Sequence, residues 1–154
     1  MATKNTPQSK LIVNRRARFD YELHDHVSVG IVLQGAEVRA VRDGHVSLRG
    51  AYATIKDGEL WLTNASFSLP ARMGEVDRVV DTRPRKLLAK KSEINKFIAA
   101  KDSGLTIVPL SMTTNTRYIK VELASAKGKK QYDKRETIKR RDTERETKRL
   151  LKRS

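Results

Sequence analysis

The sequence predicts a mainly β protein with one compact domain, either a closed barrel or a sandwich of short strands. Several short runs alternate apolar with polar residues, turn residues separate these runs, and a chain of 154 residues suits one domain with a short appendage. Only 38% of the residues are hydrophobic and 33% are charged, so the core must be concentrated in part of the chain. We place it at residues 11 to 124.

The first part of the predicted core favours strands followed by a helix. In "ARFDYELHDHVSVGIVLQG" apolar residues alternate around Tyr21 and become continuous near Ile31, which predicts two successive strands. In "QGAEVRAVRDG" the spacing of Val38 and Val41 predicts a short helix. Gly44 can end this helix because glycine tolerates the left-handed conformation.

The middle of the chain carries a hairpin signal. Alternating runs flank Asp57-Gly58, a dipeptide that favours the positive backbone angles of a tight turn. The pattern of residues 69 to 85 is irregular and includes prolines and a glycine, which predicts a long loop.

The last part of the predicted core favours a helix and two strands. Ser92 can cap the start of a helix over "SEINKFIAAKD", and Gly104 can end it. Two strands around a polar turn at residues 113 to 116 should follow, with Pro109 at an edge or a bulge. The total is about six or seven short strands with two small flanking helices.

The chain is strongly basic, with 33 Lys plus Arg against 18 Asp plus Glu, a net charge of +15. Such a charge attracts polyanions, of which RNA and DNA are the commonest and an anionic membrane is second. The sequence has no long apolar run, and "MATKNTPQSK" lacks the apolar segment of a secretory signal. We therefore expect no membrane partner and a cytoplasmic location, which the absence of cysteine fits.

Residues 125 to 154 form a basic tail that differs in kind from the core. They contain thirteen Lys or Arg against five Asp or Glu, and their few apolar residues form no helical stripe. We expect a coil in the free chain that becomes a helix on an anionic surface, because pairs such as Glu136 with Arg140 favour a helix only weakly. A merely solubilising tail is the alternative. Residues 1 to 10 are polar and predict a flexible leader.

Signatures of catalysis are weak. His24 and His26 share one face of a predicted strand, but neither a cysteine nor an acidic cluster completes a metal site. The sequence also lacks a glycine-rich phosphate loop. We predict a protein that is not an enzyme and needs no metal or cofactor, with a basic nuclease built from His and Glu as an open alternative.

Basic residues gather in three segments: "NRRAR", "TRPRKLLAKK" and "AKGKK". Each segment lies near the end of a predicted strand. The segments are therefore able to converge on one side of a small barrel, where Arg and Lys would contact the phosphates of an RNA. A solvated basic face is the alternative for any one of them.

Five stretches in one order carry a resemblance to a known family: "NRRARFDYEL", "GIVLQGAEVRAVRDGHVSL", "AYATIKDGELWL", "RPRKLLAKKSEI" and "KVELASAKGKKQYDKRETIKRRD". The chain resembles the SmpB (small protein B) family, the SsrA-binding proteins of bacterial trans-translation. The resemblance covers residues 14 to 142. It implies a closed barrel similar to the OB fold, with about six strands.

The resemblance also implies partners and a function. An SmpB-like protein would be an RNA-binding adaptor that holds the tRNA-like domain of transfer-messenger RNA (tmRNA, the SsrA RNA). Elongation factor Tu would deliver the charged RNA, with the adaptor bound, to a stalled 70S ribosome for ribosome rescue. The tail would then probe the 16S rRNA decoding centre and the empty mRNA channel. A structural, basic ribosomal protein is the alternative.

The resemblance and the basic segments together define two sets of candidate residues. The tmRNA-binding set is Asn14, Arg15, Arg16, Arg18, Arg83, Arg85, Lys86, Leu88, Lys120, Lys127, Lys129 and Lys130. The set expected to contact the decoding centre and the mRNA channel is Tyr132, Asp133, Lys134, Arg135, Lys139, Arg140 and Arg141.

Two positions depart from the family pattern. Phe19 stands where many relatives have His, so stacking or packing would replace a polar contact there. Ser28 stands where some relatives have an acidic residue, which removes any hydrogen bond that this carboxylate would make.

Overall fold

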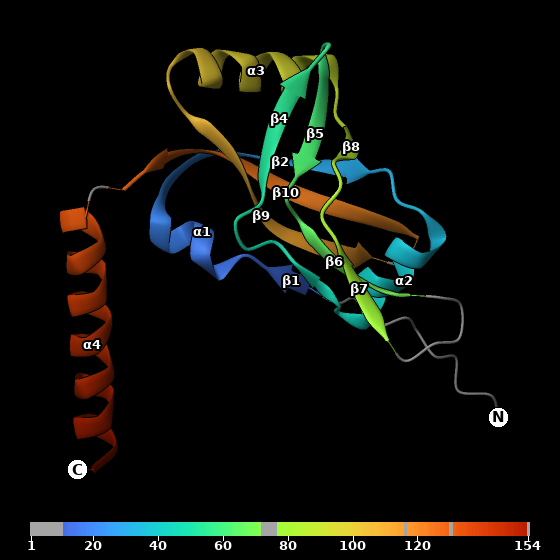
Figure 1. Ribbon diagram of the computed structural model, residues 1–154. Coiled ribbons are helices and arrows are strands. Elements are labelled where there is room, and N and C mark those ends of the chain that lie inside the picture. The colour runs from blue at the N-terminus through green and yellow to red at the C-terminus, as the bar shows by residue number, and fades with distance from the viewer. Residues whose placement is uncertain (1–10, 72–76, 116, 130, 154) are drawn as a thin grey trace.

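A computed structural model of the chain describes residues 11–71, 77–115, 117–129 and 131–153 (Figure 1). The predicted leader, Lys130, and the side chains of Tyr132 and Asp133 lie outside the described residues. The elements in chain order are β1 (Leu11–Val13), α1 (Arg15–Asp20), β2 (Tyr21–Ile31), α2 (Gly35–Asp43), β3 (Val46–Ser47), β4 (Tyr52–Lys56), β5 (Glu59–Thr63), β6 (Ser66–Pro70), β7 (Arg78–Asp81), β8 (Arg85–Leu88), α3 (Lys91–Asp102), β9 (Thr106–Asn115), β10 (Tyr118–Gly128) and α4 (Gln131–Arg153).

The strands form two antiparallel sheets, which confirms the prediction of a mainly β protein. The larger sheet has seven strands in the order β1-β9-β10-β2-β8-β5-β4, and β4 also pairs with β9 where Ala53 lies opposite Ile107. The smaller sheet has the order β3-β6-β7. The described residues contain ten strands and four helices, more of each than the sequence analysis predicted.

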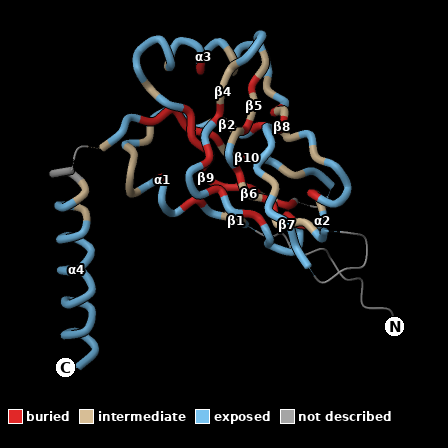
Figure 2. The backbone as a smooth tube through the Cα atoms, in the orientation of Figure 1, coloured by how far each residue is buried: buried red, intermediate tan, exposed pale blue. Residues whose placement is uncertain are grey.

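Aliphatic side chains fill the space that the strands enclose. Leu60 and Leu62 of β5, Met112 of β9, and Val121 and Leu123 of β10 are fully buried. Along β5 they alternate with more exposed residues, as expected for a sheet with one face toward a core. β9 is instead buried without interruption from Ile107 to Met112. Figure 2 shows the buried positions concentrated where β9 and β10 cross the body of the molecule.

Several local predictions are confirmed. Asp57 and Gly58 have φ of 53° and 73°, and they join β4 to β5 in a tight hairpin. Gly44 follows α2 with φ of 80°, and Gly104 follows α3 with φ of 85°. A register shift in the β9–β10 ladder pairs Leu123 with Pro109, which is the bulge expected at this proline.

The region before β2 differs from the prediction. The arginines of "NRRAR" lie on the short helix α1, whereas a strand entrance was predicted, and β2 is one continuous strand of 11 residues rather than two. The helix begins because the side-chain oxygen of Asn14 accepts a hydrogen bond from the backbone N–H of Ala17 at 3.2 Å. The apolar alternation alone did not reveal this cap.

Residues 69 to 85 are not one long loop, as was predicted. β6 extends to Pro70, and β7 returns antiparallel to it with Val79 opposite Leu69. The proline and glycine signals concealed the strand-forming pair Val79-Val80. The start of α3 also differs, since Lys90 is its N-cap and its backbone N–H donates to Glu93 at 2.9 Å.

The strand and tail near the C-terminus also differ from the prediction. β10 continues to Gly128, so residues 125 to 128 belong to the sheet, and Ser125 and Ala126 are buried. Gln131–Arg153 then form the helix α4. The helix predicted for the tail is therefore present, and its formation only on an anionic surface stays a prediction. Lys, Arg, Glu and Gln are good helix formers, and their summed propensity outweighs the missing apolar stripe.

A buried ion pair joins α2 to β8. The side chains of Glu37 and Arg85 are both 0% exposed, and Arg85 Nε donates to Glu37 Oε2 at 2.8 Å. Arg83 donates to the other oxygen of Glu37. The guanidinium of Arg85 also lies 3.7 Å above the ring centroid of Phe67. These contacts fix the position of α2 relative to the strand β8.

Replacing Glu37 should reveal how much this pair matters for stability. Glu37→Gln leaves the buried Arg85 charge with only the carboxylate of Asp81, 3.8 Å from its Nη2, so we expect the free energy of unfolding to fall by about 3 kcal/mol in a urea titration. Glu59→Gln breaks the half-exposed pair with Lys86 at 2.9 Å and should cost less than about 1 kcal/mol. Equal losses in the two variants would contradict a dominant role for the buried pair.

Candidate nucleic-acid interface

One group of basic residues lies on and beside α1. We call Arg15, Arg16, Arg18, Lys127 and Lys129 the α1 cluster. The three arginines and Lys127 are exposed. The backbone N–H of Lys129 donates to the carbonyl of Asp20 at 2.8 Å, and its Nζ donates to the carbonyl of Arg18 at 3.2 Å. The structure thus brings together the predicted residues of "NRRAR" and "AKGKK" by joining the end of β10 to the end of α1.

Asn14 positions this cluster from inside the protein. Its side-chain N–H group donates to the carbonyl of Leu48 at 3.1 Å and to the carbonyl of Pro109 at 2.9 Å. Only 5% of the residue is exposed, and its oxygen caps α1. The expectation that Asn14 contacts RNA is therefore replaced by a positioning role, because its polar atoms already bind the protein.

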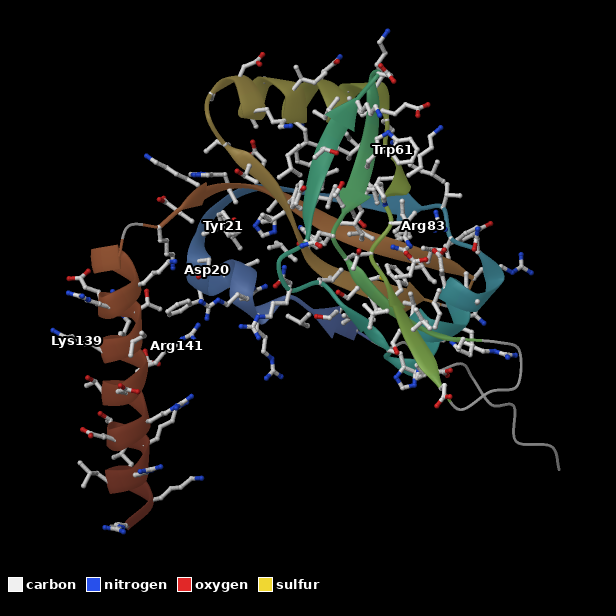
Figure 3. All side chains as sticks on the ribbon, in the orientation of Figure 1. Asp20, Tyr21, Trp61, Arg83, Lys139 and Arg141 are labelled. Atoms are coloured by element: carbon white, nitrogen blue, oxygen red, sulfur yellow. The ribbon has the colours of Figure 1, made fainter. Side chains whose placement is uncertain are left out.

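Asp20 connects α1 to the long helix α4. Its carboxylate lies 2.9 Å from Arg16 Nε and 3.2 Å from Lys134 Nζ. Figure 3 shows Asp20 on the side of α1 that faces α4. Burial raises the pKa of Asp20, but the stronger combined effect of Lys134 and Arg16 lowers it below its ordinary value. A charged carboxylate is thus the stable form at neutral pH.

A second group of candidate residues surrounds a cavity of about 340 Å³. We call it the Leu88 groove, lined by Gly30, Leu88, Arg117, Tyr118 and Lys120 among others. Leu88 is 56% exposed and Tyr118 is 73% exposed. A side chain at Gly30 would place its Cβ 3.4 Å from the Cβ of Leu88. Glycine at this position therefore avoids crowding the side chain of Leu88. An apolar floor with cations at the rim suits a nucleoside and its phosphates.

The two groups lie at opposite ends of the β2–β10 ladder. Lys120 pairs with Gly30 at one end, and Lys127 pairs with Glu22 at the other. Seven residues of strand separate the two lysines by roughly 23 Å at about 3.3 Å per residue. The predicted residues therefore do not meet at one point. They form two separate groups along the ladder.

The basic residues around β8 are engaged within the protein. Arg85 is buried, so a direct RNA contact by its side chain, which the sequence analysis expected, is not compatible with this structure. Arg83 is 40% exposed and binds Glu37, and it also lies 3.9 Å from Asp81. Lys86 is paired with Glu59. Of these three, only Arg83 and Lys86 present part of their side chains to solvent.

The predicted residues of the tail lie along α4. Arg135, Lys139, Arg140 and Arg141 are exposed, whereas Lys134 is partly covered at its contact with Asp20. Lys139 and Arg141 are two positions apart and so lie on nearly opposite sides of the helix (Figure 3). The helix presents positive charge around its circumference.

Sequence reasoning missed Arg117 and Tyr118 in the Leu88 groove. The signal for Tyr118 was its place beside a polar turn, where an aromatic residue has no core to enter. The histidines form no metal site: His26 Nδ1 lies 2.9 Å from Glu122, and the described residues contain no cluster of three or more His, Cys, Asp or Glu suited to a metal. No helix within the described ranges is long and apolar enough to cross a membrane.

Comparison with known proteins adds the family. A family model described as SmpB protein matches residues 11–153. The chain belongs to the SmpB family. It is 44% identical to the SsrA-binding protein of Coxiella burnetii (strain RSA 493 / Nine Mile phase I) over 151 residues, which cover 97% of this chain and 95% of that protein. It is also 44% identical to the SsrA-binding protein of Trichodesmium erythraeum (strain IMS101), over 99% of both chains.

A solved structure of the family supports the same assignment. It is described as "tmRNA-SmpB: a journey to the center of the bacterial ribosome", and its chain is 38% identical to this one. The two structures superpose with a TM-score of 0.64 over 83% of this chain and 94% of the other.

The contact between α1 and α4 should depend on the charge of Asp20. Because its pKa is lowered from 3.8 in the folded chain, the stabilisation is complete above that value and is lost as the pH falls through the folded pKa. Asp20→Asn should abolish the contact at neutral pH. We expect faster amide hydrogen exchange in the first two turns of α4, and unchanged exchange in β9. Unchanged exchange in α4 would show that Asp20 does not hold it.

Proposed function

We propose that this chain is an RNA-binding adaptor of trans-translation that binds the tRNA-like domain of tmRNA and brings it to stalled ribosomes. The observation that carries this proposal is the family match over residues 11–153, with 44% identity to SsrA-binding proteins across nearly the whole chain. The description of the related solved structure names both tmRNA and the ribosome. The strongly basic surface agrees with an RNA partner. We propose no catalytic residue.

The sheet supports the proposal of an OB-like closed barrel. Following the pairings from β9 through β10, β2, β8, β5 and β4 leads back to β9, because Ala53 pairs with Ile107. Six strands are thus linked in a ring, the number that the family resemblance implied. A barrel of this kind offers its outer strands and loops to nucleic acid.

The tmRNA-binding surface that we propose runs from the α1 cluster to the Leu88 groove. At the first end, exposed arginines and lysines would bind phosphates, and at the second end Leu88 would pack against a nucleoside beside Lys120. Arg83 and Lys86 would contribute only their exposed parts. Asn14 and Arg85 would act indirectly, Asn14 through α1 and Arg85 through its buried pair with Glu37. Lys130 belongs to the set by its sequence position alone.

The helix α4 would be the part that enters the ribosome. Its 23 residues span roughly 35 Å at about 1.5 Å per residue, and its cations suit a passage lined by 16S rRNA. The residues proposed to contact the decoding centre and the mRNA channel remain Tyr132, Asp133, Lys134, Arg135, Lys139, Arg140 and Arg141. An mRNA in the channel would exclude the helix by occupying the same space.

The helical state of the tail affects the energetics of this step. Ordering a coil would cost roughly 1 to 2 kcal/mol per residue in backbone entropy. We propose that the anionic channel supplies this free energy through its contacts with the cations of α4. We propose that elongation factor Tu takes part only through the charged RNA, and that the protein acts in the cytoplasm with the ribosomes.

Removing α4 should separate tmRNA binding from the action on the ribosome. Deletion of residues 131 to 154 should leave the affinity for tmRNA nearly unchanged, because the α1 cluster and the Leu88 groove remain. Peptide tagging on stalled ribosomes should be abolished in a reconstituted translation assay. Equal loss of tmRNA affinity and tagging would refute this division. Retention of the full chain on translating ribosomes through a high-salt wash would instead favour a structural ribosomal protein.

The α1 cluster should dominate the salt dependence of tmRNA binding. Replacing Arg15, Arg16 and Lys129 together by Ala should lower the slope of log K against log salt concentration by about 2 to 3, since three fewer counterions are released. The control replaces Lys91, Lys96 and Lys101, which are exposed on α3 away from both groups. An equal change of slope in the control would show that net charge alone matters.

A further inference from the structure

The turn between β3 and β4 brings another arginine next to α1. Arg49 is exposed at this turn, and "NRRAR", "TRPRKLLAKK" and "AKGKK" do not include it. The carbonyl of Leu48 accepts one hydrogen bond from Asn14 Nδ2 at 3.1 Å and another from the backbone N–H of Ala51 at 3.0 Å. The same buried amide that caps α1 therefore holds the turn that carries Arg49.

The conformation of the turn is fixed on its other side as well. Gly50 has φ of 77°, and its carbonyl accepts a hydrogen bond from Asn64 Nδ2 at 3.2 Å. Arg49 is thus mounted on a turn with tertiary contacts at both neighbouring residues. A side chain on such a turn loses little backbone freedom when it binds a ligand.

Two cavities border Asn14, and Arg16 and Arg49 line both of them. The first measures about 320 Å³ and is also lined by Tyr52, which is 40% exposed. The second measures about 400 Å³ and is also lined by Arg15. Together they form a cleft between α1 and the β3–β4 turn. We call it the Arg49 cleft.

The charges around this cleft favour an anion. Among the described residues, neither Arg15 nor Arg49 takes part in an ion pair, so their charges are available. Asp20 also lines the first cavity, but its carboxylate is paired with Arg16 and Lys134. The local balance is positive, and the guanidinium groups are suited to phosphate oxygens because their planar donors match that geometry.

We propose that the Arg49 cleft binds a backbone phosphodiester of RNA, with Arg49 on one wall and Arg15 and Arg16 on the other. The adjoining nucleoside would lie against Tyr52 in the first cavity, where an exposed ring can stack on a base. The inference rests on the proposed RNA-binding function and extends the binding surface past α1. The RNA concerned is either tmRNA or ribosomal RNA, and the two share this phosphodiester chemistry.

The test compares Arg49→Ala with Arg42→Ala. Arg42 is another exposed arginine, on α2, and it lines neither cavity, so its loss measures the effect of one charge alone. Binding is measured over a range of potassium chloride concentrations, first to a transcript of the tRNA-like domain and then to vacant 70S ribosomes. We expect Arg49→Ala to lower the slope of log K against log salt by about 0.7 to 0.9 on one of these partners, and Arg42→Ala to lower it clearly less.

The outcomes distinguish the source and decide the proposal. A loss confined to the transcript assigns the phosphodiester to tmRNA, and a loss confined to ribosomes assigns it to ribosomal RNA. Arg49→Lys should recover most of the slope because it restores the charge. Equal slopes for Arg49→Ala and Arg42→Ala on both partners would overturn the inference. The thermal unfolding temperature of Arg49→Ala should match that of the wild type. Should it be lower, the same binding measurements are made with Arg49→Gln, which also removes the charge but keeps a longer side chain.

Failure of the proposed function has a different signature. A wild-type chain that binds the tRNA-like domain no better than an unrelated transfer RNA would refute the tmRNA role. The comparison of Arg49→Ala with Arg42→Ala on ribosomes would still decide whether the cleft binds RNA.

Discussion

The buried side chain of Asn14 is the contact on which the basic face of this protein depends. One amide caps α1, holds the carbonyl of Pro109 in β9 and holds the carbonyl of Leu48 at the β3–β4 turn. Three segments that are distant in the sequence thus share one buried hydrogen-bonding group. An unsatisfied amide or carbonyl in the interior is costly in free energy. The formation of one segment is therefore coupled to the formation of the others. Two of these segments, α1 and the β3–β4 turn, carry the arginines of the basic face, and the Asn14 amide links their backbones.

Buried charged groups join α2 to β8 in a similar way. Glu37 and Arg85 satisfy each other in the interior, and Arg83 completes the carboxylate while remaining partly exposed. Arginine, a residue type that suggests RNA contact, thus serves packing at position 85 and stays partly exposed at position 83. The alternation of a strand, which sends successive side chains to opposite faces, explains the difference between Arg85 and its neighbour Lys86.

Local signals in the sequence predicted local structure well. The Asp57-Gly58 hairpin, the glycine ends of α2 and α3, and the bulge at Pro109 depend on backbone preferences of the residues themselves. α1 was missed because the apolar alternation around Tyr21 favoured a strand, although the Asn14 cap is a local contact with Ala17. The partners that bury the side chain of Asn14 lie 34 and 95 positions away and leave no local signal. The family resemblance supplied most of the candidate RNA-binding residues, but it did not show which side chains are buried. Arg49 was missed because a lone arginine in a turn has no pattern.

The attachment of α4 to the body has a mechanical consequence. The ion pair between Asp20 and Lys134 joins the helix to the body near the first turn of the helix. The rest of the helix projects from the body (Figure 1). Because the helix is attached near one end, a tilt of ~10° would move its far end by ~6 Å over its length of ~35 Å. A small reorientation of α4 beside α1 would thus move the C-terminal end of the helix much further than its first turn.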